Sequence, residues 1–190
     1  MQEEMIYLSD GDVVVRSCKV TDAMVIAHYY QENRQFLTPW EPERDEEFYT
    51  SNGWLRRLLK LREVQSMRLG YFLLILDRVS DKMLGTISFS QVSRFPIHAC
   101  NVGYSLDQTA QGRGIMTTAL KLAVDYMFDS QNMHRVSAAY MPHNERSAAV
   151  LRRLGFVVEG EAKAYLLIDG EWRDHILTAK INSNWRESAI

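Results

Sequence analysis

The positions of apolar residues along the chain predict a succession of strands and helices. Runs rich in β-branched and aromatic residues are typical of strands. Apolar residues spaced three and four apart are typical of helices that bury one face. Strands are predicted at Val13–Val15, Tyr71–Asp77, Met83–Ser93, Ala99–Leu106 and Arg135–Met141. Helices are predicted from Thr21 to about Arg34, from Asp45 to about Arg68, from Gly114 to Ser130 and from Asn144 to Leu154.

Turn-forming residues mark where several of these elements end. Asp169-Gly170 separates the segments Phe156–Ile168 and Glu171–Ile181, a pattern typical of a β-hairpin. The segment Phe36–Pro42 contains two prolines around Trp40-Glu41. Because each proline restricts its own backbone and that of the preceding residue, a stiff loop is expected there.

The helix predicted after Asp45 has two features that a structure can test. Leu55, Leu58 and Leu59 are expected on one buried face. Gly53 is a weak point, because glycine lowers helix stability by about 1 kcal/mol relative to alanine.

The order of the predicted elements is β-α-α-β-β-β-α-β-α-β-β. Three consecutive strands do not fit the regular alternation of a doubly wound sheet. We therefore expect an α/β fold with a mixed sheet, antiparallel in its first half, and helices packed on its faces. At about 150 residues per domain, the 190 residues predict a single domain.

Composition and charge narrow the function classes. Apolar residues make up 46% of the chain, which argues against intrinsic disorder, and the net charge of −2 argues against direct nucleic-acid binding. The two distant cysteines, Cys18 and Cys100, predict reduced thiols and no metal site. The most apolar run, Tyr71–Leu76, is far shorter than the roughly 20 residues of a membrane span. The first residues show no signal-peptide pattern, so a cytoplasmic protein is expected.

A glycine-containing segment at the start of a predicted helix is the main candidate for chemistry. It reads Gln111-Gly112-Arg113-Gly114-Ile115-Met116-Thr117 and follows a predicted strand. Glycines let the backbone approach a ligand without a Cβ atom in the way. The free N–H groups of a helix's first turn attract anions, and Arg113 adds a positive charge. The segment therefore predicts a phosphate or pyrophosphate cradle.

Three other interpretations of this segment were weighed. A glycine turn that merely caps a helix remains possible on this segment alone. A Walker-type phosphate loop requires Gly-Lys followed by Ser or Thr, which is absent here. A dinucleotide-binding fingerprint requires a third glycine, which is also absent.

The chain resembles the GNAT N-acetyltransferases in this segment and in a second one. Gln111 to Met116 is similar to the pyrophosphate motif of that family, and Asn144, Ser147 and Leu154-Gly155-Phe156 follow at the distance the family shows. The resemblance implies a single α/β domain over residues 12–182, with short extensions at 1–11 and 183–190. It implies a mixed, mostly antiparallel sheet, helices on both faces and a splayed strand pair that holds acetyl-CoA.

Three further segments are similar to the RimJ/RimL branch of the family, and in particular to the RimJ type. They are Phe36–Pro42, Tyr140–Ser147 and Tyr165–His175. Members of this branch acetylate the N-terminal amines of ribosomal proteins. The resemblance therefore implies acetylation of an N-terminal α-amine, with alanine as the expected first residue.

The resemblance also implies which residues bind acetyl-CoA. The strand end Tyr104-Ser105-Leu106 is expected to hold the pantetheine and to polarise the thioester carbonyl through a backbone N–H. Asn144 is expected to bond the pantetheine arm, and Ser147 to donate a proton near the thiolate; the alternative for both is helix capping. The full set of expected acetyl-CoA contacts is Tyr104, Ser105, Leu106, Gln111, Gly112, Arg113, Gly114, Ile115, Met116, Thr117, Asn144 and Ser147.

The chain departs from the broad family at three positions. Met116 stands where glycine or alanine is usual, so its side chain must point away from the pyrophosphate. Leu151 stands where many members have a tyrosine acid, and Asn101 lies near the usual site of a carboxylate. The usual acid and base therefore cannot be transferred to this chain.

An N-terminal acceptor lessens the need for a strong base. At pH 7.5 roughly a third of α-amino groups are neutral, against roughly 0.1% of lysine side chains. Glu41 is the first candidate to position or deprotonate the amine, because burial beside Trp40 raises a carboxyl pKa. The candidate catalytic residues are Glu41, Ser147 and Tyr104, and the candidate acceptor contacts are Trp40, Glu41, Tyr140, His143 and His175. The acidic run from Glu41 to Glu47 would attract a basic protein tail if it lines the acceptor cleft.

Two other functions stay open at this point. One is acetylation of a small amine such as a polyamine or an aminoglycoside. The other is a CoA-binding or ribosome-associated module without turnover, which the missing tyrosine acid keeps open. The expected partner is a ribosomal-protein N-terminus, and the chain is expected to be a monomer or a homodimer.

Overall fold

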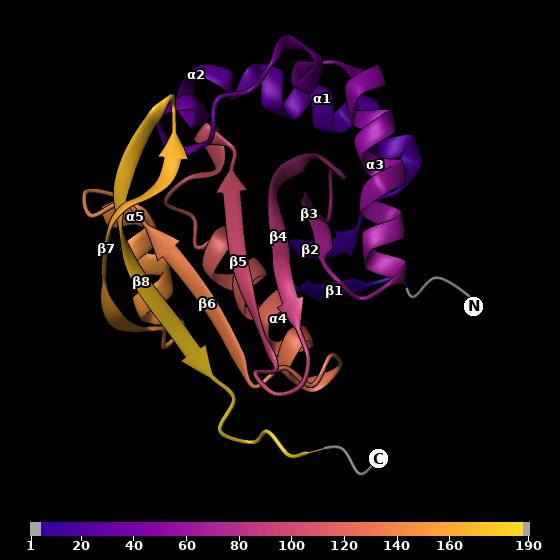
Figure 1. The fold of residues 1–190 in the computed structure, drawn as a ribbon. Coiled ribbons are helices and arrows are strands. Elements are labelled where there is room, and N and C mark those ends of the chain that lie inside the picture. The colour runs from indigo at the N-terminus through magenta and orange to yellow at the C-terminus, as the bar shows by residue number, and fades with distance from the viewer. Residues whose placement is uncertain (1–4, 188–190) are drawn as a thin grey trace.

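The computed structural model describes residues 5–187. Their strands form one eight-stranded sheet (Figure 1). The sheet order is β1-β2-β3-β4-β5-β6-β8-β7, and neighbouring strands are antiparallel except the parallel pair β5 and β6. The strands are β1 (Tyr7–Asp10), β2 (Val13–Ser17), β3 (Tyr71–Asp77), β4 (Met83–Ser93), β5 (Ala99–Leu106), β6 (Arg135–Tyr140), β7 (Val157–Ile168) and β8 (Glu171–Ile181). The mixed, mostly antiparallel sheet is therefore confirmed. Strand β1 was not predicted, so the sheet begins before residue 12.

Helices cover both faces of this sheet, as expected (Figure 1). Residues of α1 (Ala23–Glu32) and α3 (Ser51–Ser66) pack on one face, and residues of α4 (Ile115–Asp129) and α5 (Glu145–Arg153) pack on the other. The short helix α2 (Arg34–Leu37) follows α1. Single helical turns lie at Val20–Asp22, Thr38–Trp40, Glu46–Tyr49 and Gln108–Ala110. No helix within residues 5–187 has both the length and the apolar character needed to cross a membrane.

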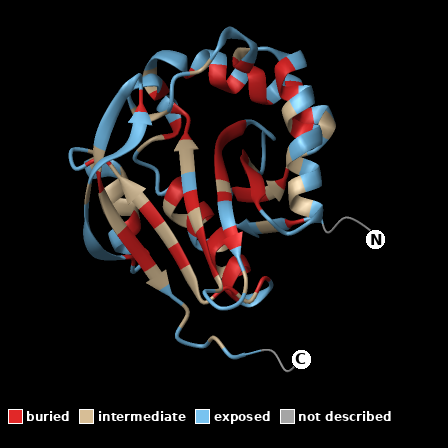
Figure 2. Ribbon diagram, viewed as in Figure 1, coloured by how far each residue is buried: buried red, intermediate tan, exposed pale blue. Residues whose placement is uncertain are grey.

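The strand β3 explains why the sheet has two separate cores. Phe72, Leu74 and Leu76 pack with α1 and α3, whereas Leu73 and Ile75 pack with α4. Because successive side chains of a strand point to opposite faces, a strand buried on both faces has a continuous apolar sequence. Figure 2 shows the buried positions on the sheet and on the helix faces that cover it.

The segment between α1 and α3 differs from its prediction. The expected stiff loop at residues 36–42 is largely helical, with Pro39 in the first turn, where a proline loses no helical hydrogen bond. The single helix expected from Asp45 is divided at Thr50. There the Thr50 hydroxyl accepts a hydrogen bond from the Gly53 N–H at 3.0 Å and starts α3 afresh.

The buried face of α3 also differs in part. Trp54 and Leu58 are 3% and 1% exposed and pack on the sheet, whereas Leu55 and Leu59 are 40% and 53% exposed. Trp54 and Leu58 are four positions apart and share a face, and each exposed leucine follows one of them by about 100° of rotation. The aromatic ring of Trp54, stacked on Tyr30 at 5.3 Å, decides which face is buried.

Strands β5 and β6 separate along their length, as the splayed pair was expected to do. They pair only from Ala99 to Asn101, opposite Arg135 to Ser137. Beyond this point β5 pairs only with β4, and β6 pairs only with β8. Figure 1 shows the two strands close together at their start and apart at their ends. The facing edges of both strands are therefore left without a backbone ladder.

Replacing Gly53 by alanine is expected to destabilise the protein although alanine favours helices. A Cβ atom at Gly53 would lie 2.0 Å from the Glu47 carbonyl oxygen, because the preceding helical turn crosses α3 there. We expect Gly53→Ala to lower the free energy of unfolding by about 1–3 kcal/mol, as overpacking does. Urea denaturation measures the free energy of unfolding of each variant. The control Asn52→Ala changes an exposed residue of the same turn, and equal stability of the two variants would contradict the close approach.

Candidate active site

The segment before α4 forms an open cradle of backbone atoms. Gly112 and Gly114 have φ angles of +73° and +75°, which L-residues with side chains rarely adopt, and no other atom lies within 4 Å of where their Cβ atoms would be. Gly114 is the N-cap residue of the fifteen-residue helix α4. The side chains of Ile115 and Met116 are buried in the core. The unusual Met116 thus points away from the cradle, and the first-turn N–H groups stay accessible to an anion.

The polar side chains of this segment take different positions. Gln111 Nε2 donates to the backbone carbonyls of Leu106 and Asp107 at 3.1 and 3.2 Å, so this side chain holds the loop itself. Arg113 is exposed and lines a cavity of about 270 Å³ together with Asp10, Asp12 and Thr118. Thr117 is half-buried.

The end of β5 presents different side chains to the two faces of the sheet. Ser105 Oγ lies 2.9 Å from the Tyr29 hydroxyl of α1 and 3.0 Å from Thr86 Oγ1. Tyr104 packs against the opposite core, and Leu106 is buried. The Ser105 side chain is therefore occupied on the α1 face. Its backbone, with that of Leu106, borders the gap between β5 and β6.

The start of α5 brings Ser147 and Tyr104 together. Asn144 Oδ1 accepts a hydrogen bond from the Ser147 N–H at 3.1 Å, so Asn144 caps the helix. The Tyr104 hydroxyl lies 2.7 Å from Ser147 Oγ. Desolvation raises the pKa of Tyr104 to about 12, against the opposing effect of the Ser147 hydrogen bond. Tyr104 is therefore protonated at neutral pH.

This pair lies close to the position where a tyrosine is missing from the sequence motif. Leu151, one turn further along α5, is 1% exposed and belongs to the core. The Leu151 side chain has no polar atom and cannot act as an acid. A tyrosine hydroxyl nevertheless contacts α5, because Tyr104 of β5 extends to Ser147. Sequence spacing alone did not show this, since the two residues are 43 positions apart.

Glu41 lines a second cavity, of about 260 Å³, on the α1 side of the sheet. The Glu41 side chain is 20% exposed, and its Oε2 lies 3.9 Å from Arg44 Nε. Desolvation raises the pKa of Glu41 above its ordinary value, and the positive charge of Arg44 opposes this. The cavity is lined by Tyr30, Arg34, Leu37, Thr38, Glu41, Pro42, Glu43, Arg44, Tyr49 and Asp169.

Two lining residues of this cavity were missed by the sequence analysis. Arg44 Nε is buried without a hydrogen-bond partner, and the Arg44 guanidinium lies 4.5 Å from the Phe48 ring centre. Tyr30 is 5% exposed, and burial raises the pKa of its hydroxyl. In the sequence, Tyr30 is indistinguishable from an aromatic core residue of a helix, and Arg44 lies in a charged segment with no motif around it. The hairpin turn also contributes, because the Asp169 N–H donates to the Glu41 carbonyl at 3.0 Å.

The remaining candidate acceptor contacts do not line this cavity. Trp40 and His143 are brought together, with ring centres 5.5 Å apart, across the chain from α2 to the start of α5. Tyr140 ends β6 and influences the pKa of Tyr104. His175 is 4% exposed in β8, and its Nδ1 lies 3.0 Å from the Arg173 carbonyl oxygen. No contact joins His175 to Glu41.

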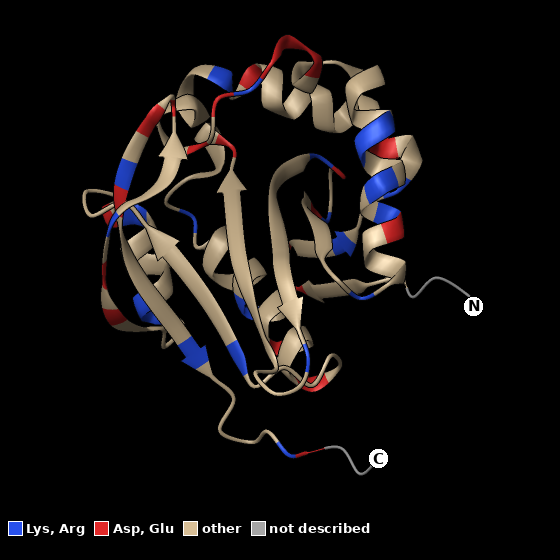
Figure 3. Ribbon diagram, in the orientation of Figure 1, with Lys and Arg blue, Asp and Glu red and all other residues tan. Residues whose placement is uncertain are grey.

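The acidic run from Glu41 to Glu47 is largely neutralised. Figure 3 shows acidic residues gathered before α3 and basic residues along α3. Glu46 pairs with Arg34 at 2.5 Å, Glu47 pairs with Arg56, and Asp45 lies 3.9 Å from Arg57. The field that this run presents to a basic partner is therefore weaker than the residue count indicates.

Comparison with known proteins places these features in a family. Residues 12–157 match the family described as Acetyltransferase (GNAT) domain. The chain is 46% identical over 180 residues to the [ribosomal protein uS5]-alanine N-acetyltransferase of Escherichia coli K12, covering 95% of this chain and 93% of that protein.

Solved structures give the same result. The ribosomal-protein-S5-alanine acetyltransferase of Vibrio fischeri is 49% identical to this chain and superposes with a TM-score of 0.93. The match covers 96% of this chain and 100% of the Vibrio fischeri chain. Mycobacterium smegmatis RimJ in complex with CoA-disulfide is 26% identical and covers 98% of this chain and 91% of its own, with a TM-score of 0.88.

The cradle before α4, the parted strands β5 and β6, and the near full-length similarity agree with one another. The chain belongs to the GNAT family of acetyltransferases and is an N-acetyltransferase of the RimJ type.

Proposed function

We propose that this N-acetyltransferase transfers the acetyl group of acetyl-CoA to the N-terminal α-amine of a ribosomal protein that begins with alanine. The near full-length similarity to the E. coli enzyme named for that reaction carries the proposal. The similarity includes the segments that line the Glu41 cavity, and not the cradle alone. The cytoplasm is the expected compartment.

The described residues fit acetyl-CoA. The glycines at 112 and 114 leave open space at the start of α4, where backbone N–H groups receive the pyrophosphate. The unpaired edges of β5 and β6 offer backbone donors and acceptors to the amides of the pantetheine arm. Bound there, acetyl-CoA supplies the activated thioester. Asn144 Oδ1 caps α5 by accepting a hydrogen bond from the Ser147 N–H, so Asn144 positions Ser147. Its Nδ2 group is the donor that we assign to the pantetheine arm.

Glu41 is proposed to hold and deprotonate the acceptor amine. Its carboxylate is 20% exposed and lines the cavity, and its raised pKa is closer to the pKa of the amine than that of an exposed glutamate. An α-amine has a pKa of about 7.7–8.0, so a modest base is sufficient. The positive charge of Arg44, 3.9 Å away, favours the ionised form of Glu41.

The Tyr104–Ser147 pair is proposed to return a proton to the departing thiolate. The two hydroxyls are 2.7 Å apart, so a proton that Ser147 gives up can be replaced from Tyr104. Because the pKa of Tyr104 is raised to about 12, the pair is fully protonated before the reaction. The acid is thus on the α5 face of the sheet and the base is on the α1 face.

Acceptor specificity is the first test. Thiol release from acetyl-CoA is measured with matched peptides that begin with free Ala, free Ser, or blocked Ala plus an internal Lys, and with spermidine. We expect turnover on free N-termini only, fastest with Ala. Turnover on spermidine alone would indicate a small-amine enzyme. Acetyl-CoA binding without turnover on any of them, including purified unacetylated ribosomal protein, would indicate a binding module.

Replacing Glu41 by glutamine is expected to lower kcat by about 100-fold, the usual contribution of a positioned base. Glu41 must be ionised to accept a proton, so wild-type kcat/KM falls as the pH drops through its raised pKa. In Glu41→Gln the pH profile of kcat/KM should no longer show the fall due to Glu41 and should show only the fall due to protonation of the acceptor amine. The affinity for CoA stays unchanged. Glu43→Gln, an exposed carboxylate on the same cavity, should have a much smaller effect. Equal loss in both variants would remove Glu41 from the mechanism.

The cradle is tested by an isosteric pair at Gly114. Asn and Asp both tolerate a positive φ better than other residues, so Gly114→Asn and Gly114→Asp introduce similar backbone strain. Only Asp places a negative charge among the N–H groups that receive pyrophosphate. We expect Gly114→Asp to bind CoA at least about tenfold more weakly than Gly114→Asn, an effect of roughly 1.4 kcal/mol. Calorimetric titration with CoA measures both, and equal affinities would place the pyrophosphate elsewhere.

A further inference from the structure

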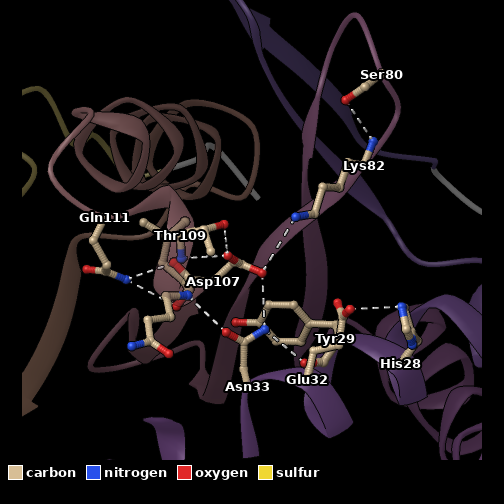
Figure 4. Close-up of polar contacts among 11 residues, drawn as sticks. His28, Tyr29, Glu32, Asn33, Ser80, Lys82, Asp107, Thr109 and Gln111 are labelled. Atoms are coloured by element: carbon tan, nitrogen blue, oxygen red, sulfur yellow. Dashed lines mark hydrogen bonds and ion pairs between the residues drawn. The ribbon is translucent and has the colours of Figure 1, made fainter.

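A buried carboxylate lies between the two halves of the candidate site. Asp107 directly follows β5 and is 5% exposed. Its Oδ1 accepts hydrogen bonds from the Thr109 N–H at 2.7 Å and the Thr109 hydroxyl at 2.5 Å. Its Oδ2 accepts from Asn33 Nδ2 at 3.2 Å and lies 3.9 Å from Lys82 Nζ. Figure 4 shows these contacts converging on Asp107.

Asn33 completes the contact from the α1 side. It is 3% exposed and follows the last residue of α1. Its Oδ1 accepts from the Gln108 N–H at 2.9 Å, while its Nδ2 also donates to the Tyr29 carbonyl at 3.0 Å. Every side-chain polar atom of Asn33 and Asp107 is therefore partnered. We name Asn33 and Asp107, with these bonds, the strand-end clamp.

The strand-end clamp connects the two segments that carry the site. After Asp107, one helical turn leads to Gln111 and the cradle, and Gln111 Nε2 donates back to the Asp107 carbonyl. After Asn33, α2 and one further turn lead to Trp40 and Glu41. The Tyr29 hydroxyl, on the same last turns of α1, lies 2.9 Å from Ser105 Oγ. Together these hydrogen bonds connect the cradle and the acceptor segment to the end of β5.

Electrostatics favours an ionised Asp107 in this position. Burial alone would raise the pKa of Asp107, but hydrogen bonds from Thr109 and Asn33, helped by Lys82, outweigh it and lower the pKa. Charge-assisted hydrogen bonds contribute more to stability than neutral ones. A neutral side chain at 107 would keep the volume and lose most of that strength.

We propose that Asn33 and Asp107 are positioning residues that hold the acetyl-CoA cradle in register with the acceptor segment. They act through Gln108–Gly114 and through the end of α1. The role of Asn33 and Asp107 in placing the acceptor segment rests on the proposed function. Their role in placing the cradle concerns CoA binding, which can be measured without any acceptor.

The test uses the isosteric variants Asn33→Asp and Asp107→Asn and the double variant Asn33→Asp/Asp107→Asn in the full-length protein. We expect each single variant to raise the Kd for CoA and the KM for acetyl-CoA about tenfold, the scale of one lost charge-assisted bond. At saturating acetyl-CoA, kcat should fall far less. The double variant restores one carboxylate and one amide to the pair, so it should bind CoA no more weakly than the worse single variant. Thr109→Val, which removes only one hydroxyl donor, serves if a single variant fails to fold.

The matched control is Asp22→Asn. Asp22 forms a buried ion pair with Arg16 at 2.7 Å at the opposite end of α1, so its loss weakens the fold without touching the clamp. We expect this control to lower the melting temperature and leave the Kd for CoA unchanged. If the folded clamp variants lose stability and still bind CoA like the wild type, or if the two single effects add in the double variant, the proposal is wrong. A wild-type protein that binds CoA and acetylates no peptide would contradict the proposed function and leave the CoA arm of this test intact.

Discussion

The parting of β5 from β6 is the constraint on which the rest of the site depends. Two parallel strands that stop pairing after Asn101 and Ser137 leave backbone N–H and C=O groups without partners in the middle of a sheet. Backbone groups without a strand partner take their hydrogen bonds from water or from a ligand. The pantetheine arm of acetyl-CoA is polar and extended, so the gap suits the cosubstrate in the proposed function.

The end of β5 also explains why the proposed base and the proposed acid lie on different faces of the sheet. Successive side chains of β5 point to opposite faces, so Ser105 meets α1 while Tyr104 meets α5. The half-buried carboxylate Glu41 belongs to the α1 side, and the hydroxyl pair Tyr104–Ser147 belongs to the α5 side. The end of β5 therefore lies between the proposed base and the proposed acid.

Polar groups gather beside this gap within an otherwise apolar structure. Asn33, Thr86 and Asp107 are 3%, 5% and 5% exposed, yet each has partners of its own. Buried polar networks of this kind rigidify a site when they are fully satisfied and destabilise it when one member is lost. Arg44 differs, because its Nε is buried beside Glu41 without a hydrogen-bond partner. That unsatisfied donor belongs to a residue that lines the Glu41 cavity.

Apart from β1, the sequence predicted the strands, most of the helices and a glycine cradle at residues 112 and 114, because these depend on side-chain periodicity and on backbone conformations that few residues adopt. It also placed Ser147 and Glu41 among the candidates. Tertiary packing was needed to show which face of α3 is buried, that Ser105 turns toward α1, and that the Tyr104 hydroxyl reaches Ser147 Oγ. It alone joined Asn33 to Asp107, 74 residues apart. Contacts between distant segments have no local pattern, because they depend on how the helices pack on the two faces of the sheet.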